Sequence, residues 1–172
     1  GSFFKDLREQ SAKELADMDL PGYAVGGVVV DFTRTPEALE ASLPFLPEEK
    51  PRYLMGVGTP VDIINAVEQG IDMFDCVLPT RNGRHGKVYT SQGEMNLAAA
   101  KVREDDEPID PNSTCPITSK YSRSYLRHLF TVNEMLGMRL ATLHNLHFYC
   151  TLMQNIRDSI EAGRFAQFKE EF

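Results

Sequence analysis

One segment organises the rest of the chain: Ile71-Asp72-Met73-Phe74-Asp75-Cys76-Val77-Leu78-Pro79-Thr80-Arg81-Asn82-Gly83-Arg84. It begins as an apolar run, which is typical of a strand that is buried on both faces. Pro79 cannot donate a hydrogen bond to a neighbouring strand, so we expect the strand to end before it. The segment therefore predicts a buried strand that carries one carboxylate, Asp75, near its end.

A group of basic residues follows this strand, in what we expect to be a loop containing Asn82-Gly83 and Gly86. The basic side chains are Arg81, Arg84, His85 and Lys87. A carboxylate at the end of a strand, followed by a basic loop, is the pattern of a site that acts on an anionic partner. The alternative is that Asp75 caps a loop and the arginines are solvated surface residues, and the pattern alone leaves both interpretations open.

The chain before this segment alternates between strand-like and helix-like stretches. Strands are predicted over 23–30 and 52–57, and a helix capped by Ser2 precedes the first of them. Thr35-Pro36 and Thr59-Pro60 each predict an N-cap followed by proline in the first helical turn. This alternation indicates an α/β fold with right-handed βαβ units and a parallel sheet, in which polar chemistry gathers at the carboxyl ends of the strands.

The chain after this segment has a different character. Residues 87–90 and 94–97 predict a hairpin joined by Ser91-Gln92-Gly93, and the acidic stretch 104–111 predicts a loop. Two apolar stripes predict helices over 121–136 and 146–160, which we expect Gly137 and Gly163 to end. Such stripes usually form a core rather than a ligand site.

Composition excludes several classes of protein. The chain has 172 residues, 42% hydrophobic and 25% charged, which is ordinary for a globular protein. Its net charge of −7 argues against a general nucleic-acid binder, so a basic segment would act locally. No apolar run is long enough to span a membrane, and an odd number of widely spaced cysteines (Cys76, Cys115, Cys150) fits a reducing, cytoplasmic environment.

Several longer motifs resemble the tRNA-guanine transglycosylase (queuine tRNA-ribosyltransferase) family. They lie, in chain order, at 22–27, 53–58, 70–76, 79–81, 121–123, 125–129 and 144–146. The resemblance implies a TIM-type (β/α)8 barrel with an inserted zinc subdomain. A whole barrel needs roughly 250 residues. This chain would then supply the last three βα units (1–86), a hairpin and helical region in place of the zinc subdomain (87–145) and a C-terminal helix packed on the barrel (146–172).

The resemblance also implies roles for particular residues. Asp75 matches the family's nucleophile, which forms a covalent bond to the ribose while the wobble guanine of tRNA is exchanged for a 7-deazaguanine in the queuosine pathway. The implied partners are the tRNA anticodon loop and a guanine or 7-deazaguanine base. Positions matching the base pocket are Gly26, Gly27, Val28 and Met55, and positions matching tRNA contacts are Arg81 and Arg84.

The chain departs from the family pattern in its upstream part. The family's general-base Asp and base-reading Asp would both lie before Gly1, so we expect the chain alone to be inactive. Asp31-Phe32 stands where the family has Gly-Glu, which leaves the preferred base open. The resemblance therefore leaves two functions: part of a catalytic transglycosylase, or a non-catalytic tRNA-binding or dimer-partner relative.

A second departure lies at the family's zinc ligands, which are three cysteines and a histidine. The matching positions here are Ser113, Cys115, Thr118 and His144. Hydroxyls are poor zinc ligands at neutral pH, and one thiolate with one imidazole is not a closed tetrahedral site. We therefore expect no cofactor, and no structural zinc or only weak zinc binding. The family tends to form homodimers through this region, so a homodimer is one candidate assembly.

Overall fold

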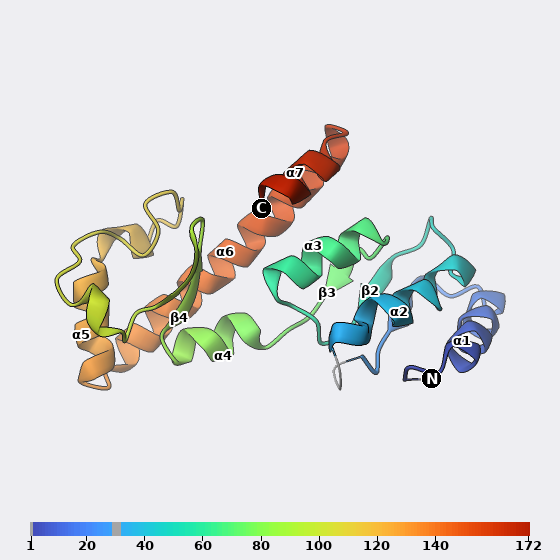
Figure 1. The fold of residues 1–172 in the computed structure, drawn as a ribbon, viewed down its shortest axis with the longest axis horizontal. Coiled ribbons are helices and arrows are strands. Elements are labelled where there is room, and N and C mark those ends of the chain that lie inside the picture. The colour runs from blue at the N-terminus through green and yellow to red at the C-terminus, as the bar shows by residue number, and fades with distance from the viewer. Residues whose placement is uncertain (1, 29–31) are drawn as a thin grey trace. The chain divides into compact units, whose positions relative to one another are not determined.

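Three short parallel strands form a sheet in the described part of residues 1–77. The computed structural model describes residues 2–28 and 32–172. Strands β1 (Tyr23–Val25), β2 (Arg52–Leu54) and β3 (Met73–Phe74) lie in the order β1-β2-β3. Figure 1 labels β2 and β3. Val25 pairs with Leu54, and Leu54 pairs with Phe74. The parallel α/β arrangement predicted from the alternation is therefore present.

Helices precede and connect these strands. They are α1 (Lys5–Asp17), η1 (Phe32–Arg34), α2 (Thr35–Glu40), η2 (Leu43–Phe45) and α3 (Pro60–Glu68). The predicted start of α3 is confirmed, because the hydroxyl of Thr59 accepts a hydrogen bond from the backbone N–H of Asp62 at 3.2 Å. The strands and helices enclose an apolar core that includes Val25, Val28 and Leu54.

Several local predictions for this part of the chain are wrong. β3 lies at one end of the described sheet and Met73 is 52% exposed, so this strand is not buried on both faces. The N-cap of α1 is Phe4 rather than Ser2, and the N-cap of α2 is Arg34 rather than Thr35. The predicted strand over 23–30 ends at Val25, and its residues 29 and 30 lie outside the described residues.

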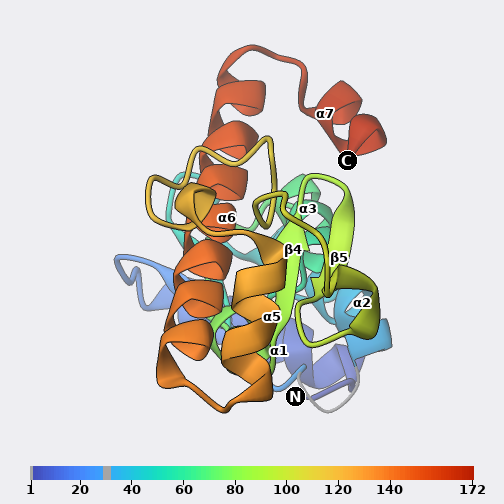
Figure 2. The ribbon, with the colours of Figure 1, turned by 90° about the vertical axis from the view of Figure 1, so that its left-hand side faces the viewer.

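Residues 78–172 form a second compact unit. Its elements are α4 (Leu78–Arg84), β4 (Lys87–Thr90), β5 (Gly93–Asn96), η3 (Ala100–Val102), η4 (Thr118–Lys120), α5 (Arg123–Thr131), α6 (Met135–Glu161) and α7 (Phe165–Glu171). The predicted hairpin is confirmed: β4 and β5 pair antiparallel, beside α5 and the long α6 (Figure 2). This unit starts at Leu78, whereas the sequence led us to divide the chain after residue 86.

Two glycines lie inside helices, contrary to the sequence-based prediction. Gly83 was expected in a loop, and Gly137 was expected to end a helix. Gly83 lies in α4, so the expected basic loop is instead a helix; a Cβ on Gly83 would stand 2.7 Å from the backbone Cα of Thr142 on α6. Gly137 lies in the first turn of α6, where a Cβ would stand 2.9 Å from the Cβ of Leu129. Both glycines permit close packing of helices, which is a tertiary reason for their presence.

A buried asparagine joins the elements of this unit. The side chain of Asn145 on α6 is fully buried and accepts a hydrogen bond from the backbone N–H of Tyr89 at 3.1 Å. Its amide donates to the carbonyl oxygens of Pro79 (2.9 Å) and Lys87 (3.0 Å). One side chain therefore satisfies backbone groups of α4 and of strand β4.

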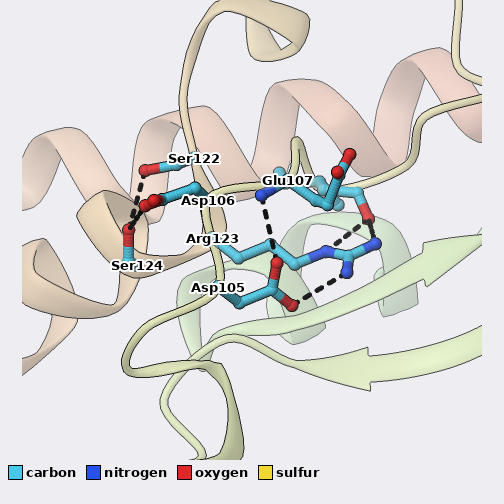
Figure 3. Close-up of polar contacts among 7 residues, drawn as sticks. Asp105, Asp106, Glu107, Ser122, Arg123 and Ser124 are labelled. Carbon is cyan, nitrogen blue, oxygen red and sulfur yellow. Dashed lines mark hydrogen bonds and ion pairs between the residues drawn. The ribbon is translucent and has the colours of Figure 1, made fainter.

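The acidic loop over 104–111 is anchored to the start of α5 (Figure 3). The Arg123 guanidinium forms an ion pair with Asp105 at 2.9 Å and donates to the carbonyl oxygen of Ile109 at 3.1 Å. The Ser124 hydroxyl donates to Asp106 at 3.1 Å. These contacts stabilise residues 104–111, which form neither a strand nor a helix.

In the part of the chain that the structure describes, none of the helices combines the length and apolar character that crossing a membrane requires.

Candidate functional site at the strand ends

Three of the predicted site residues directly follow the three parallel strands. Gly26 follows β1, Met55 follows β2 and Asp75 follows β3. The last paired row of the sheet is Val25, Leu54 and Phe74, so these three residues occupy the next position along each strand. The carboxyl ends of the strands thus bring together residues that are far apart in the sequence.

The Asp75 carboxylate is exposed and held in one orientation by two donors. The Tyr53 hydroxyl donates to Oδ1 at 2.6 Å, and the backbone N–H of Gly56 donates to the same oxygen at 2.9 Å. These bonds, with that of Tyr53 the largest influence, lower the pKa of Asp75 below its ordinary value, and the same contact raises the pKa of Tyr53. The carboxyl group is therefore ionised at neutral pH and available to solvent.

The base-pocket positions lie around Gly26 and Met55. The Met55 side chain is 46% exposed, and a Cβ on Gly26 would stand 3.1 Å from its sulfur. Gly27 has a φ of 71°, which favours glycine, and the side chain of Val28 is fully buried in the core. The glycine pair therefore presents bare backbone next to an exposed, adaptable apolar side chain.

Arg8 of α1 stabilises the backbone at Gly26 through a hydrogen bond. Its side chain is almost completely buried, and its guanidinium donates to the carbonyl oxygen of Gly26 at 2.8 Å and to that of Ser2. Burial lowers the pKa of Arg8. A buried cation bonded to backbone carbonyls fixes the position of the chain at Gly26.

A close approach between the ends of β2 and β3 brings Asp75 to Gly56. Gly56 has a φ of 75°, and a Cβ on Gly58 would stand 2.2 Å from the Cβ of Cys76. No side chain fits at Gly58 without moving Cys76, the neighbour of Asp75. The glycines of the motif at 53–58 are therefore required by the local geometry of the carboxylate.

The predicted tRNA-contact residues, Arg81 and Arg84, are exposed on α4. The side chain of His85, just after this helix, interacts with the carbonyl oxygen of Arg81 at 2.7 Å. These residues belong to the second compact unit, 78–172.

The four positions that match the family's zinc ligands lie in the second unit. Cys115, Thr118 and His144 are buried, and Ser113 is partly buried. The Thr118 hydroxyl lies 3.4 Å from Nδ1 of His144, and Nε2 of His144 donates to the carbonyl oxygen of Tyr89 at 2.8 Å. Among residues 2–28 and 32–172 there is no group of three or more His, Cys, Asp or Glu side chains that could hold a metal.

Sequence reasoning missed residues that act by supporting others. Tyr53 binds Asp75, Arg8 binds the Gly26 carbonyl, and Asn145 joins α4, β4 and α6. Two of them carry a weak signal: Tyr53 opens a motif of the resemblance, and Asn145 follows His144 in another. Arg8 carries none, because an arginine in an amphipathic helix normally faces solvent.

These observations define an α/β protein with an ionised carboxylate and a glycine turn at the carboxyl ends of parallel strands. A family model described as Queuine tRNA-ribosyltransferase matches residues 1–172. The chain therefore belongs to the queuine tRNA-ribosyltransferase family.

Bacterial relatives carry the same name. A Queuine tRNA-ribosyltransferase of Clostridium perfringens (strain SM101) is 53% identical over 171 residues, which cover 98% of this chain and 45% of the relative. Those of Clostridium kluyveri and Lachnospira eligens are each 53% identical over 173 residues, covering 99% of this chain and 46% of each relative. The chain thus spans about half the length of the curated relatives it matches.

Proposed function

We propose that this chain is the C-terminal part of a tRNA-guanine transglycosylase and carries its nucleophile, Asp75. The reaction exchanges the wobble guanine of a tRNA for a 7-deazaguanine base. The observation that carries the proposal is the row formed by Gly26, Met55 and Asp75 beyond the paired ends of β1, β2 and β3. The family membership and the names of the relatives support the same reaction. In this proposal, β1 to β3 are the last three strands of a (β/α)8 barrel.

The environment of Asp75 suits a nucleophile. Tyr53 and Gly56 both bind Oδ1, and we assign the attack on the anomeric carbon of the ribose to Oδ2. As the C–O bond forms, the bond to guanine breaks and the base leaves with the electron pair. A second displacement by the incoming base releases Asp75 and restores the original configuration, as in a retaining glycosidase. The lowered pKa keeps the attacking group ionised.

The other predicted residues take roles in binding. Met55 packs against the exchanged base, and the backbone at Gly26, Gly27 and Val28 binds its edge, with Arg8 holding the Gly26 carbonyl in place. The arginines Arg81 and Arg84 of α4 bind phosphates of the anticodon loop. The target base leaves its stack to enter the site.

A catalytic test compares two aspartates that lie close together in the chain. Asp75→Asn, made in a full-length protein containing these residues, keeps the shape of the side chain but removes the charge. We expect incorporation of labelled guanine into tRNA to fall at least about 1,000-fold, as when other enzymic nucleophiles are removed. Asp72→Asn is the matched control, because Asp72 is exposed and accepts a bond from the Arg52 backbone, so we expect activity within a few fold of wild type.

Activity of Asp75→Asn close to that of the control would contradict the proposal. The isolated 172-residue chain gives a second test, since we propose that it is inactive without the upstream carboxylates. Exchange of labelled guanine by that chain alone would refute this part of the proposal.

A second candidate is a non-catalytic partner subunit that keeps the fold and binds tRNA. The observation that favours it is the pair of hydroxyls at Ser113 and Thr118, where the family has thiolates. The upstream sequence distinguishes the two. Aspartates at the ends of the two expected upstream strands support the enzyme, and their absence supports the partner subunit.

A further inference from the structure

The cluster at Ser113, Cys115, Thr118 and His144 has a donor set that does not fit zinc. It offers one thiol, one imidazole and two hydroxyls, whereas structural zinc takes four thiolate or imidazole ligands. Three of these residues are at most 3% exposed, and Thr118 at the start of η4 bonds to His144 of α6. These residues therefore lie in one region of the second unit although their donor set does not suit zinc.

Both ring nitrogens of His144 have a hydrogen-bond partner. The carbonyl oxygen of Tyr89 can only accept, so Nε2 carries the proton of the 2.8 Å bond to it. In the neutral ring Nδ1 is then an acceptor, and the Thr118 hydroxyl, 3.4 Å away, is its donor. The nitrogen with a free electron pair thus faces the position at which the family has a cysteine.

The loop residues are linked to one another as well. The backbone N–H of Cys115 donates to the Ser113 hydroxyl at 3.2 Å, and the backbone N–H of Ser119 donates to the Cys115 carbonyl at 3.3 Å. Hydrogen bonds therefore connect Ser113 to Cys115 within the loop, and Thr118 through His144 to strand β4.

We propose that this hydrogen-bonded cluster replaces zinc as the anchor between the loop over 113–120, α6 and β4. The unit formed by residues 78–172 then folds without a metal. By residue type, the cluster is two thiolates short of the family's zinc site, because Cys115 and His144 supply one thiol and one imidazole. This inference is independent of the proposed base exchange, since it concerns the fold of the second unit.

The test measures zinc content and thermal stability of the purified 172-residue chain and of two double variants. For wild type we expect less than about 0.1 zinc per chain after mild chelation, and the same Tm in chelator as in added zinc. Ser113→Cys with Thr118→Cys completes four ligands, so we expect about one zinc per chain and a Tm that falls when chelator is added.

The matched control, Ser119→Cys with Thr131→Cys, adds two thiols at exposed positions of the same unit. We expect it to hold no more zinc than wild type. Stoichiometric zinc in wild type, a wild-type Tm that chelator lowers, or equal zinc in the two double variants would each overturn the proposal. A Ser113→Cys, Thr118→Cys chain that folds only when zinc is added counts in its favour.

If the Ser113→Cys, Thr118→Cys variant folds neither with nor without zinc, a single substitution tests the hydrogen bonds instead. Thr118→Val keeps the shape of a side chain that is 1% exposed but removes the donor to His144. We expect its Tm to fall by roughly 2–4 °C, the shift that one lost hydrogen bond gives in a chain of this size. Thr131→Val, on the exposed surface of α5, is the control, and an equally small change in both variants would contradict the role of Thr118.

Discussion

Two aspartates, one in each unit of this chain, differ in their exposure and in their hydrogen-bond partners. Asp75, at the end of β3, is exposed, and Tyr53 and Gly56 bind one of its oxygens. Asp110, in the second unit, is 6% exposed and accepts hydrogen bonds on both oxygens from Ser91 (2.7 and 2.8 Å) and on Oδ1 from Asn112 (3.0 Å). Both have a lowered pKa, yet only the first is exposed to solvent.

The difference teaches that a shifted pKa alone does not identify a reactive group. In the second unit, buried polar side chains such as Asp110 and Asn145 form hydrogen bonds with backbone groups. These bonds stabilise the fold. At the strand ends of the first unit, polar contacts orient Asp75 while leaving it accessible. Asp75 therefore differs from Asp110 in its exposure and in having the Tyr53 and Gly56 donors on a single oxygen.

The largest effect on stability is expected at Asn145. Asn145→Ala leaves the Tyr89 N–H and the carbonyl oxygens of Pro79 and Lys87 without their buried partner. Because each unsatisfied buried group is costly, we expect the free energy of unfolding to fall by about 3 kcal/mol, measured by denaturant titration. Asn155→Ala, an exposed position on the same helix, should change it by less than about 0.5 kcal/mol.

A smaller effect, and one that depends on pH, is expected at Asp110. Burial raises its pKa, but hydrogen bonds from Ser91 and Asn112 outweigh burial, so the pKa in the folded state lies below the ordinary value. The stabilisation is therefore present above the ordinary carboxyl pKa and is lost as pH falls through the lowered one.

We expect Asp110→Asn to cost about 2 kcal/mol at neutral pH and to flatten the acid limb of a plot of unfolding free energy against pH. Glu161→Gln, at an exposed position near the end of α6, is the control. An acid limb equally steep in Asp110→Asn and wild type would show that another group is responsible.

The smallest effect is expected at Tyr53. Tyr53→Phe removes the largest of the influences that lower the pKa of Asp75, so that pKa should rise towards its ordinary value in an NMR titration of the carboxyl carbon. In the full-length enzyme we expect kcat to fall about 2- to 10-fold, the worth of one hydrogen bond. Tyr125→Phe, a partly exposed tyrosine of α5, should change neither quantity.

Much of the fold could be predicted from local sequence. The alternation of apolar runs with Thr-Pro pairs predicts parallel βα units, and the start of α3 at Thr59 follows from its capping side chain. The order of the motifs suggested the family, to which the chain belongs. The alternation also placed Gly26, Met55 and Asp75 towards the carboxyl ends of their strands. It made the first two strands too long, because β1 ends at Val25 and β2 at Leu54, so Gly26 and Met55 follow the strands instead of lying in them.

The rest depended on contacts between residues far apart in the sequence. Pro79 and Gly83 suggested a strand end and a loop, but proline also suits the first turn of a helix, and Gly83 is needed where α4 meets Thr142. We predicted that α6 would be shorter, because Gly137 suggested the end of the preceding helix. In the structure Gly137 lies within α6, where its small size permits close packing against Leu129. No local pattern shows that Arg8 is buried or that Tyr53 faces Asp75.

The most direct measurement traps the covalent intermediate. A full-length protein containing these residues is incubated with tRNA and an incoming base, denatured and digested, and the modified peptide is sequenced by mass spectrometry. We expect a ribose ester on Asp75, and no adduct in Asp75→Asn. An adduct on a different residue, or the same amount of adduct in Asp75→Asn, would contradict the assignment of Asp75 as the nucleophile.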